Sequence, residues 1–204
     1  MKKIAAYLYF VFCRIFFSIF CPLKVHGREN LPARCFILCS NHNSHMDTPV
    51  LMLATGIPFS QFGMIAAKDY FFDNSWRKMT AGIAMNLIPI DRKVSRQSLK
   101  KNISACKNFV ENNEGYLIMF PEGTRSLTGD MQPFKRGAAM IALALAVPLI
   151  PAYIDGTYLS MRKGQIFPRF RKIHVRIGKP IFASHNRSRL TELLENSIKD
   201  LSSG

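Results

Sequence analysis

Short apolar runs that alternate with longer, more polar stretches are the feature that most constrains the fold of this chain. Runs of this length, bounded by turn residues, predict buried strands, and the stretches between them are long enough for helices. Strands that alternate with helices indicate a parallel sheet covered on both faces. The sequence therefore predicts an α/β fold with a mostly parallel central sheet flanked by helices. The predicted strands cover residues 36–39, 63–67, 86–90, 116–120, 149–154 and 173–177.

Two of the stretches between these runs have a clear helical pattern. Residues 95–113 place apolar side chains at helical spacing on one face and lysines elsewhere, which predicts an amphipathic helix. Residues 138–147 are apolar all round, which predicts a buried helix that Pro148 ends. The apolar face of the first helix consists of Leu99, Ile103, Cys106 and Val110.

The N-terminal residues 1–21 form an aromatic-rich apolar stretch that Arg14 interrupts. A bilayer span needs about 20 apolar residues, and a central arginine costs about 2.5–3.5 kcal/mol of insertion free energy. We therefore expect a helix that lies in one leaflet or dips into it, with a buried core helix as the alternative. The residues before Cys21 offer no small-x-small cleavage site, so a removed signal peptide is not expected.

The length of the chain, 204 residues, is sufficient for one full core and short for two. No internal repeat, low-complexity tract or linker divides it. We therefore expect two parts, an N-terminal membrane-associated hydrophobic helix at residues 1–24 and a single domain at residues 25–204.

The charge balance is strongly basic, with 28 Lys and Arg against 13 Asp and Glu and a net charge of +15. Residues 156–191 contain basic side chains and no carboxylate, whereas a solvated surface normally carries both signs. Together with 16 Phe and 10 Met, this composition favours an anionic membrane surface as partner. No RNA-binding signature accompanies the charge, so no nucleic-acid partner is expected.

The cysteines are five in number, form no Cys-x-x-Cys pair and fall mostly inside apolar runs. This usage is typical of reduced, buried thiols in a cytosolic compartment. With the N-terminal helix, it predicts a monotopic protein on the cytoplasmic face of the inner (plasma) membrane.

A histidine and an aspartate, His42 and Asp47, lie between the first predicted strand and the helix that follows it. Five residues apart on one continuous helix, they would point about 140° away from each other. They meet only if His42 still lies in the turn. Asp47 would then hold the proton on Nδ1 of His42 and leave Nε2 free to act as a general base on a bound hydroxyl.

Two other interpretations of the same turn remain open from the residues alone. Asp47 or Thr48 is also suited to cap the helix, with Pro49 at its first position. His42, His45 and Asp47 are metal-ligand types, but no further His or carboxylate stands at a spacing typical of metal sites.

A second polar turn, residues 120–126, follows the predicted strand at 116–120. Gly123 allows a ligand to approach the backbone closely, Thr124 offers a hydroxyl, and Arg125 offers a planar guanidinium suited to phosphate. Taken alone, such a turn could equally be a surface loop with a salt bridge.

Further basic residues recur at corresponding places. Arg92 follows the predicted strand at 86–90, and Lys135 precedes a helix whose N-terminus attracts anions. Because the carboxyl ends of parallel strands meet at one edge of a sheet, we expect these turns to lie on the same side as His42. The sequence then predicts a base beside an anion-binding site.

These blocks, taken in order, resemble the glycerolipid acyltransferases of the 1-acyl-glycerol-3-phosphate acyltransferase type. The resemblance covers roughly residues 25–180. It rests on Asn-His-x-Ser-x-x-Asp at 41–47, Ile-Asp-Arg at 90–92, Phe-Pro-Glu-Gly-Thr-Arg-Ser at 120–126, Phe-Lys-Arg-Gly at 134–137 and Val-Pro-Leu-Ile-Pro at 147–151.

The resemblance implies transfer of a fatty acyl group from a thioester, on coenzyme A or acyl carrier protein, to the free hydroxyl of a lysophospholipid. The expected acceptor is 1-acylglycerol-3-phosphate, and the product is phosphatidic acid. His42 would be the general base and Asp47 its orienting partner, and neither a cofactor nor a metal is expected. The residues expected to bind the acceptor are Arg92, Glu122, Gly123, Thr124 and Arg125, with Lys135 and Lys68 as weaker candidates.

Two alternatives to this activity follow. The acceptor could be another lysolipid, such as a lyso-ornithine lipid, which lacks the phosphate that the arginines suit. The protein could also bind anionic lipid without catalysis, in which case it would need the basic stretch and residues 1–21 but no intact base, orienting partner and acceptor site.

Overall fold

The protein is seen in a computed structural model that describes residues 2–68, 86–91, 95–113, 115–161, 165, 168–182 and 186–204. Its described strands form one sheet in the order β1-β7-β6-β2-β5-β3-β4. All neighbouring strands run parallel except β6 and β7, which are antiparallel. The predicted α/β fold with a mostly parallel sheet is confirmed. The strands are β1 (Leu23–His26), β2 (Ile37–Ser40), β3 (Phe62–Ala67), β4 (Asn86–Ile90), β5 (Tyr116–Met119), β6 (Leu149–Asp155) and β7 (Ile173–Ile177).

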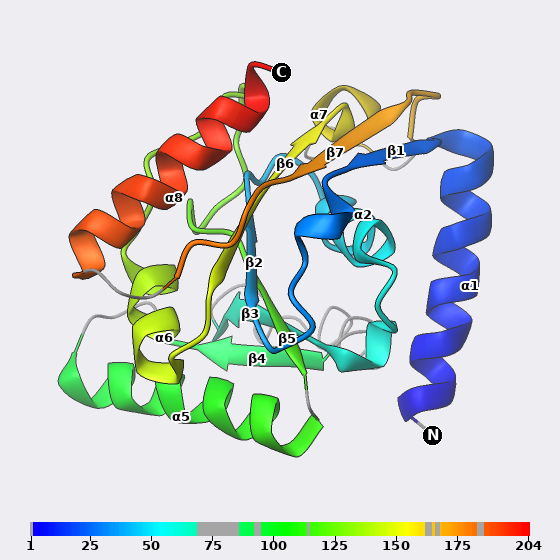
Figure 1. Cartoon of the computed structure of the whole chain (residues 1–204). Coiled ribbons are helices and arrows are strands. Elements are labelled where there is room, and N and C mark those ends of the chain that lie inside the picture. The colour runs from blue at the N-terminus through cyan, green and yellow to red at the C-terminus, as the bar shows by residue number, and fades with distance from the viewer. Residues whose placement is uncertain are drawn as a thin grey trace.

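Helices cover both faces of this sheet (Figure 1). One face packs against α1 (Lys2–Phe20) and α2 (Asp47–Thr55), and the other against α5 (Arg96–Asn113), α6 (Gly137–Leu145) and α8 (Arg187–Ser202). Along β2, Leu38 belongs to the first core, while Ile37 and Cys39 belong to the second. Successive side chains of a strand point to opposite faces, so a continuous apolar run fills both cores. The shorter elements are η1 (Arg28–Asn30), η2 (Phe59–Gln61) and α7 (Thr157–Ser160).

The two predicted helices differ slightly from expectation. The amphipathic helix is α5, and its Cys106 is buried in the second core. The second helix, α6, begins at Gly137 and ends at Leu145, because Ala146 adopts a left-handed conformation with φ 52°. Ala144 is exposed, so α6 buries one side rather than its whole surface.

β1 and α8 are among the elements that were not predicted from the sequence. The strand β1 is short and alternates half-buried with exposed residues, and it is fixed by parallel pairing with β7. The helix α8 has an amphipathic pattern that buries Leu190, Leu194 and Ile198. Its N-terminus is capped by Asn186, whose side chain accepts hydrogen bonds from two backbone N–H groups.

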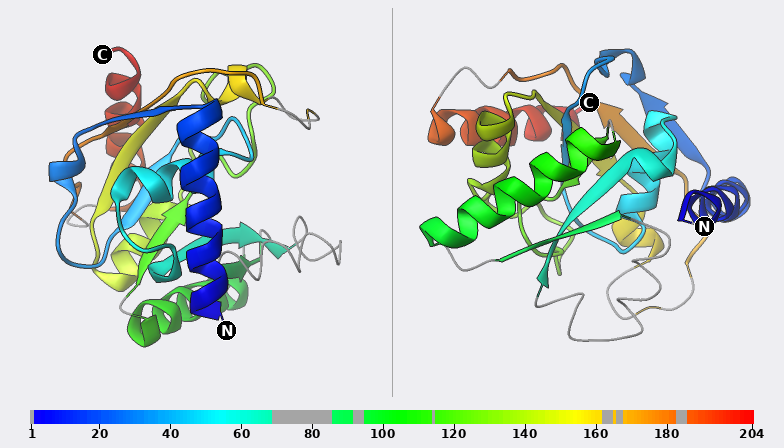
Figure 2. Two further views of the ribbon diagram at one scale, coloured as in Figure 1. Left: turned by 90° about the vertical axis from the view of Figure 1, so that its right-hand side faces the viewer. Right: turned by 90° about the horizontal axis from the view of Figure 1, so that it is seen from below.

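The helix α1 packs along one side only. Ala6, Cys13 and Phe17 are buried in the first core, where α1 contacts α2 and η2. Figure 2 shows α1 at the margin of the molecule, outside the sheet. In the described part of the chain, residues Lys3–Phe20 form one helix long and apolar enough to cross a membrane, and only 17% of this stretch is buried. The alternative interpretation, a buried core helix, is therefore wrong.

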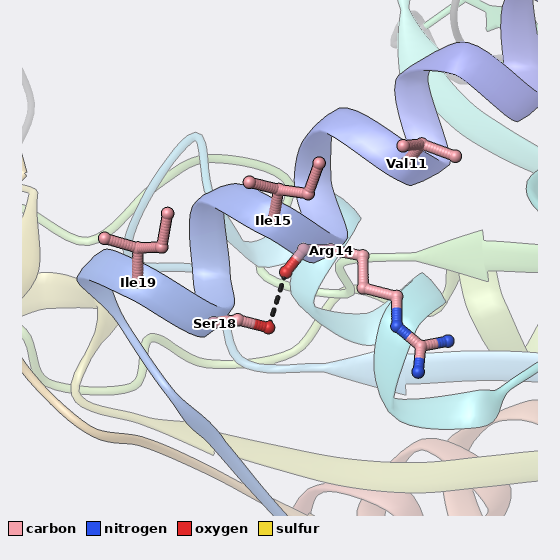
Figure 3. A pocket seen from close by; sticks show the side chains of 5 residues that line it. All are labelled: Val11, Arg14, Ile15, Ser18 and Ile19. Carbon is pink, nitrogen blue, oxygen red and sulfur yellow. Dashed lines mark hydrogen bonds between the residues drawn. The ribbon is translucent and has the colours of Figure 1, made fainter.

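The outward side of α1 carries a shallow groove (Figure 3). Ser18 Oγ donates a hydrogen bond to the Arg14 carbonyl at 2.7 Å, and the Arg14 guanidinium extends away from Ile15 and Ile19. All residues that line this groove belong to α1, so the groove is separate from the turn that contains His42. Its lining residues are Val11, Arg14, Ile15, Ser18 and Ile19.

Candidate active site

The turn after β2 begins where Asn41 ends the strand. The Asn41 side chain donates to the Ile154 carbonyl at 2.9 Å and accepts the Ile154 N–H at 2.8 Å. At Ile154, the Asn41 side chain thus takes the place of a backbone partner from β2. The chain therefore leaves the sheet at His42, at the carboxyl end of β2 and β6, where sites form in parallel sheets.

His42 and Asp47 meet, as the sequence predicted. Nδ1 of His42 lies 2.9 Å from Oδ2 of Asp47, and α2 begins at Asp47, so His42 lies in the turn before the helix. The same oxygen accepts the N–H groups of Asn43 at 2.6 Å and Ser44 at 2.7 Å. The Asp47 side chain is fully buried. Three donors therefore fix one carboxylate oxygen, and this oxygen fixes the imidazole.

The capping interpretation of this turn is wrong. The residue at the cap of α2 is Met46, and no side chain accepts a hydrogen bond there. Pro49 is the third residue of the helix rather than the first. The Asp47 carboxylate reaches backward to the turn instead of forward to the helix N–H groups. The described residues contain no group of three or more His, Cys, Asp or Glu side chains placed to hold a metal ion, so His42, His45 and Asp47 do not form one.

The ring of His42 is also held by an aromatic neighbour. Phe120 stacks on it, with ring centroids 3.9 Å apart and the planes 12° from parallel. The His42 side chain is 20% exposed, and in the described part of the chain its Nε2 has no hydrogen-bond partner. One face of the ring is covered and one nitrogen is engaged, which leaves Nε2 available to a substrate.

The turn at 120–126 is bound to the turn of His42 by two hydrogen bonds. Glu122 Oε1 accepts the backbone N–H of His42 at 2.7 Å, and Ser126 donates its N–H to the His42 carbonyl at 2.8 Å. The second oxygen of Glu122 accepts the Gln132 N–H at 2.9 Å. These contacts bring the two predicted turns together at one edge of the sheet.

The carboxyl group of Glu122 is only 2% exposed. This burial raises its pKa to about 7, an effect that the N–H groups of Gln132 and His42 oppose and the nearby charge of Asp47 increases. Sequence reasoning placed Glu122 among the acceptor-binding residues. In the structure both of its oxygens accept backbone N–H groups.

Lys135 lies against the same turn. Gly123 has a φ of +74°, and a Cβ atom at this position would come within 2.9 Å of the Lys135 ammonium. The Lys135 N–H also donates to the Pro121 carbonyl at 2.9 Å. Thr124 is exposed and Arg125 is partly exposed. The structure therefore brings Lys135 to the turn that contains Gly123, Thr124 and Arg125. The side chains of Lys135, Thr124 and Arg125 carry polar groups suited to an anion.

Lys68 directly follows β3, which is two strands from β2 in the sheet. Its ammonium pairs with Asp91 at 3.0 Å, and the Asn102 side chain of α5 holds the Asp91 backbone by two bonds of 3.0 Å. Asp91 follows β4, which is three strands from β2, or about 14 Å at the usual strand spacing. Arg92, the other residue predicted at this turn, lies outside the described residues.

Several contacts of the site were not foreseen from the sequence. Phe120 is the first residue of the second turn, and an aromatic side chain in a turn expected to lie near His42 was a signal that could have predicted the stacking. By contrast, Ser44 Oγ donates to the Met161 carbonyl at 2.8 Å, and these residues are far apart in the chain. No local pattern connects such a pair.

Comparison with known proteins agrees with this geometry. The sequence model of the Acyltransferase family matches residues 22–155. A 1-acyl-sn-glycerol-3-phosphate acyltransferase from Bacillus subtilis (strain 168) is 30% identical over 204 residues, which cover 92% of each chain. The enzyme of the same name from Limnanthes douglasii is 32% identical over 78% of this chain and 54% of its own. The chain thus spans about half the length of that plant relative.

A solved structure is also similar over the whole chain. The crystal structure of the 1-acyl-sn-glycerophosphate (LPA) acyltransferase PlsC from Thermotoga maritima superposes with a TM-score of 0.70. It is 28% identical in sequence, and the match covers 100% of this chain and 82% of that one. The chain therefore belongs to the Acyltransferase family, in the group of PlsC-type 1-acyl-sn-glycerol-3-phosphate acyltransferases.

Proposed function

We propose that this protein transfers a fatty acyl group from an acyl thioester to the free hydroxyl of 1-acylglycerol-3-phosphate and so forms phosphatidic acid. The observation that carries this proposal is the 2.9 Å contact between His42 Nδ1 and Asp47 Oδ2, in a turn joined to the 120–126 turn. The activity in the names of the Bacillus and Thermotoga relatives supports it.

The proposed reaction begins with the acceptor hydroxyl next to Nε2 of His42. Asp47 keeps the proton on Nδ1, so Nε2 takes the hydroxyl proton as the oxygen attacks the thioester carbonyl. The tetrahedral intermediate then collapses, the C–S bond breaks, and the departing thiolate takes the proton back from Nε2. The products are an ester and a free thiol, so the step needs no net proton or electron.

The acceptor phosphate is assigned to the basic residues beside the second turn. Arg125 and Lys135 supply the charge, Thr124 supplies a hydroxyl, and Gly123 supplies the space that the Lys135 ammonium uses. Lys68 and Arg92 have a lesser role in this proposal, because their segment follows strands farther from β2. Glu122 acts by holding the turn of His42, since its two oxygens are already occupied by N–H groups.

We further propose that the protein is monotopic, with α1 in the plane of one leaflet as the helix of an N-terminal membrane-associated part, residues 1–24, and with residues 25–204 as the acyltransferase domain. One side of α1 packs against α2 and η2, so a spanning α1 would draw these elements into the bilayer. The exposed side carries Ile4, Leu8 and Phe12. All five cysteines are free thiols, which supports the cytoplasmic face, where coenzyme A or acyl carrier protein would deliver the acyl group.

The test is identification of the lipid product. The purified protein in detergent is given a radiolabelled acyl group on coenzyme A or on acyl carrier protein, with 1-acylglycerol-3-phosphate, other lysophospholipids or lyso-ornithine lipid as acceptor. We expect labelled phosphatidic acid from the first acceptor. A product from another lysolipid alone would retain the chemistry and replace the acceptor. No product from any pair, in folded protein, would favour an anionic-lipid-binding protein without catalysis.

A further inference from the structure

Residues 168–172, which precede β7, lie beside the C-terminal end of α1 (Figure 1). Arg171 donates its N–H to the Phe20 carbonyl at 3.3 Å, and Ile173 donates its N–H to the Pro22 carbonyl at 2.9 Å. The rings of Phe20 and Phe170 are 5.2 Å apart between centroids. Two segments that are distant in sequence thus form one local surface.

This surface exposes large apolar side chains. Phe170 is 72% exposed, and Ile15 and Ile19 in the last turns of α1 are 56% and 59% exposed. Phe170 packs on Phe20, and a row of ring contacts continues from Phe20 through Phe16 to the exposed Phe12. Phe170 therefore extends the apolar surface of α1 beyond the end of the helix. Contiguous exposed apolar side chains of this size indicate a contact with a protein or a membrane.

Basic residues flank Phe170 in the sequence. Arg169, Arg171 and Lys172 are exposed, and no ion pair among the described residues involves them. Arg14 adds a further cation on α1, where its guanidinium extends away from Ile15 and Ile19 (Figure 3). An aromatic residue flanked by exposed cations suits an anionic lipid surface, because the ring enters the interface while the cations contact headgroups.

We propose that residues 168–172 are a second membrane-contact element, in which Phe170 inserts at the interface and Arg169, Arg171 and Lys172 bind anionic headgroups. The proposal rests on the membrane attachment proposed above and adds a specific site to it. The charge complementarity and the continuity with the apolar side of α1 favour a lipid surface over a second copy of this chain.

The element is also connected to the turn of His42. Ser160 Oγ donates to the Arg169 carbonyl at 2.9 Å and lies 3.1 Å from the buried Cys21 sulfur. The next residue, Met161, accepts the hydrogen bond of Ser44. A short chain of contacts through the end of α7 therefore links the proposed lipid contact to the proposed base, and it would hold the base close to the bilayer surface.

The experiment measures binding of the full chain to vesicles of phosphatidylcholine with and without phosphatidylglycerol, by sedimentation. We expect Phe170→Ala to weaken binding to both kinds of vesicle by about tenfold, through the loss of buried apolar area, and Phe170→Leu to restore most of it. Arg171→Ala should weaken binding about fivefold, and only to vesicles that contain phosphatidylglycerol. The matched controls, which should bind as the unchanged protein does, are Phe182→Ala, at a side chain 54% exposed, and Arg187→Ala.

Acyl transfer in detergent separates this proposal from the proposed function. Phe170→Ala should keep full activity there, since the detergent presents the acceptor without a bilayer. Unchanged vesicle binding by Phe170→Ala would overturn the proposal, as would a monomeric Phe170→Ala from a dimeric parent, because the surface would then be a protein interface. If the parent protein transfers no acyl group, the activity fails while the binding result still decides the membrane contact.

Discussion

Glu122 Oε1 accepts the backbone N–H of His42 at 2.7 Å, so a buried carboxylate of one turn fixes the position of the proposed base in another. The two turns follow β2 and β5, which are neighbours in the sheet. A residue whose type suits ligand binding thus serves to join the proposed base to the proposed phosphate site.

Replacing this carboxylate should disturb the turn and alter the pH dependence of stability. Glu122→Gln leaves one of two buried N–H groups without an acceptor, at a cost of about 1–3 kcal/mol in the free energy of unfolding. The pKa of Glu122 is raised from 4.5 to about 7, so the folded state binds more protons than the unfolded state in this range. The contribution of Glu122 protonation to the free energy of unfolding is therefore complete below pH 4.5, and it is lost as the pH rises to about 7.

Chemical denaturation at a series of pH values checks this prediction. The free energy of unfolding of Glu122→Gln should change less between pH 4.5 and 7 than that of the parent protein. Glu192→Gln, at an exposed residue of α8, is the control and should follow the parent. Parallel curves for the parent and Glu122→Gln would mean that Glu122 does not titrate in this range.

Removing the stacked ring should reduce turnover without abolishing it. In Phe120→Leu the His42 ring loses its aromatic neighbour, and such pairs are worth about 0.5–1.5 kcal/mol, or roughly a two- to tenfold fall in kcat. Steady-state kinetics in detergent measure the effect. Phe62→Leu, which removes a buried ring packed on Tyr116, should lower the melting temperature and leave kcat unchanged. Equal kcat values for both variants would show that the stack does not position His42.

Arg125, in the turn after β5, and Lys68, which follows β3, should differ in their effect on the KM for the acceptor. Arg125→Ala should raise the KM for 1-acylglycerol-3-phosphate by about ten- to a hundredfold, the value of a charge-assisted hydrogen bond. Lys68→Ala should raise it less, because Lys68 pairs with Asp91 beyond β4. The KM for the acyl thioester is measured as the control. A larger effect from Lys68→Ala would place the phosphate at the β4 end of the sheet.

Two glycines with the same positive φ, Gly123 and Gly56, allow the effect of backbone strain to be separated from the effect on acceptor binding. Gly123 and Gly56 both have a φ of +74°, so an alanine at either position costs about 1 kcal/mol or more of stability. Only at Gly123 would the new Cβ atom crowd the Lys135 ammonium. Gly123→Ala should therefore raise the KM for the acceptor, whereas Gly56→Ala should lower the melting temperature alone. An equal KM in the two variants would remove Lys135 from the acceptor site.

The parts of the fold that the sequence predicts are those with a local signal. The apolar runs of β2, β3, β5 and β6 were found because both of their faces are buried, which leaves a nearly continuous apolar pattern. β7 instead shows the alternation of a half-buried strand, with Ile173, Val175 and Ile177 buried. β1 has no such run, since Lys24 and His26 face outward, and its place depends on pairing with β7. The antiparallel arrangement of β6 and β7 has no local signal either.

The same distinction holds for the site. His42 and Asp47 are close in sequence, so turn geometry showed how they can meet, and the resemblance to the acyltransferase family made this contact the expected one. The role of Glu122 depends on its burial beneath a turn some eighty residues away, and a carboxylate next to Gly123 and Arg125 looks like a ligand-binding group in isolation. Met161 contacts Ser44 only because α7 ends beside the first turn.

The kcat of His42→Ala, compared with that of His26→Ala, tests the central claim most directly. His26 is an exposed histidine at the end of β1 and serves as the matched control. Loss of a positioned general base should lower kcat for acyl transfer to 1-acylglycerol-3-phosphate by about 10²–10⁴-fold, while His26→Ala keeps the activity of the parent. A folded His42→Ala protein with the parent's kcat would contradict the assignment of His42 as the base.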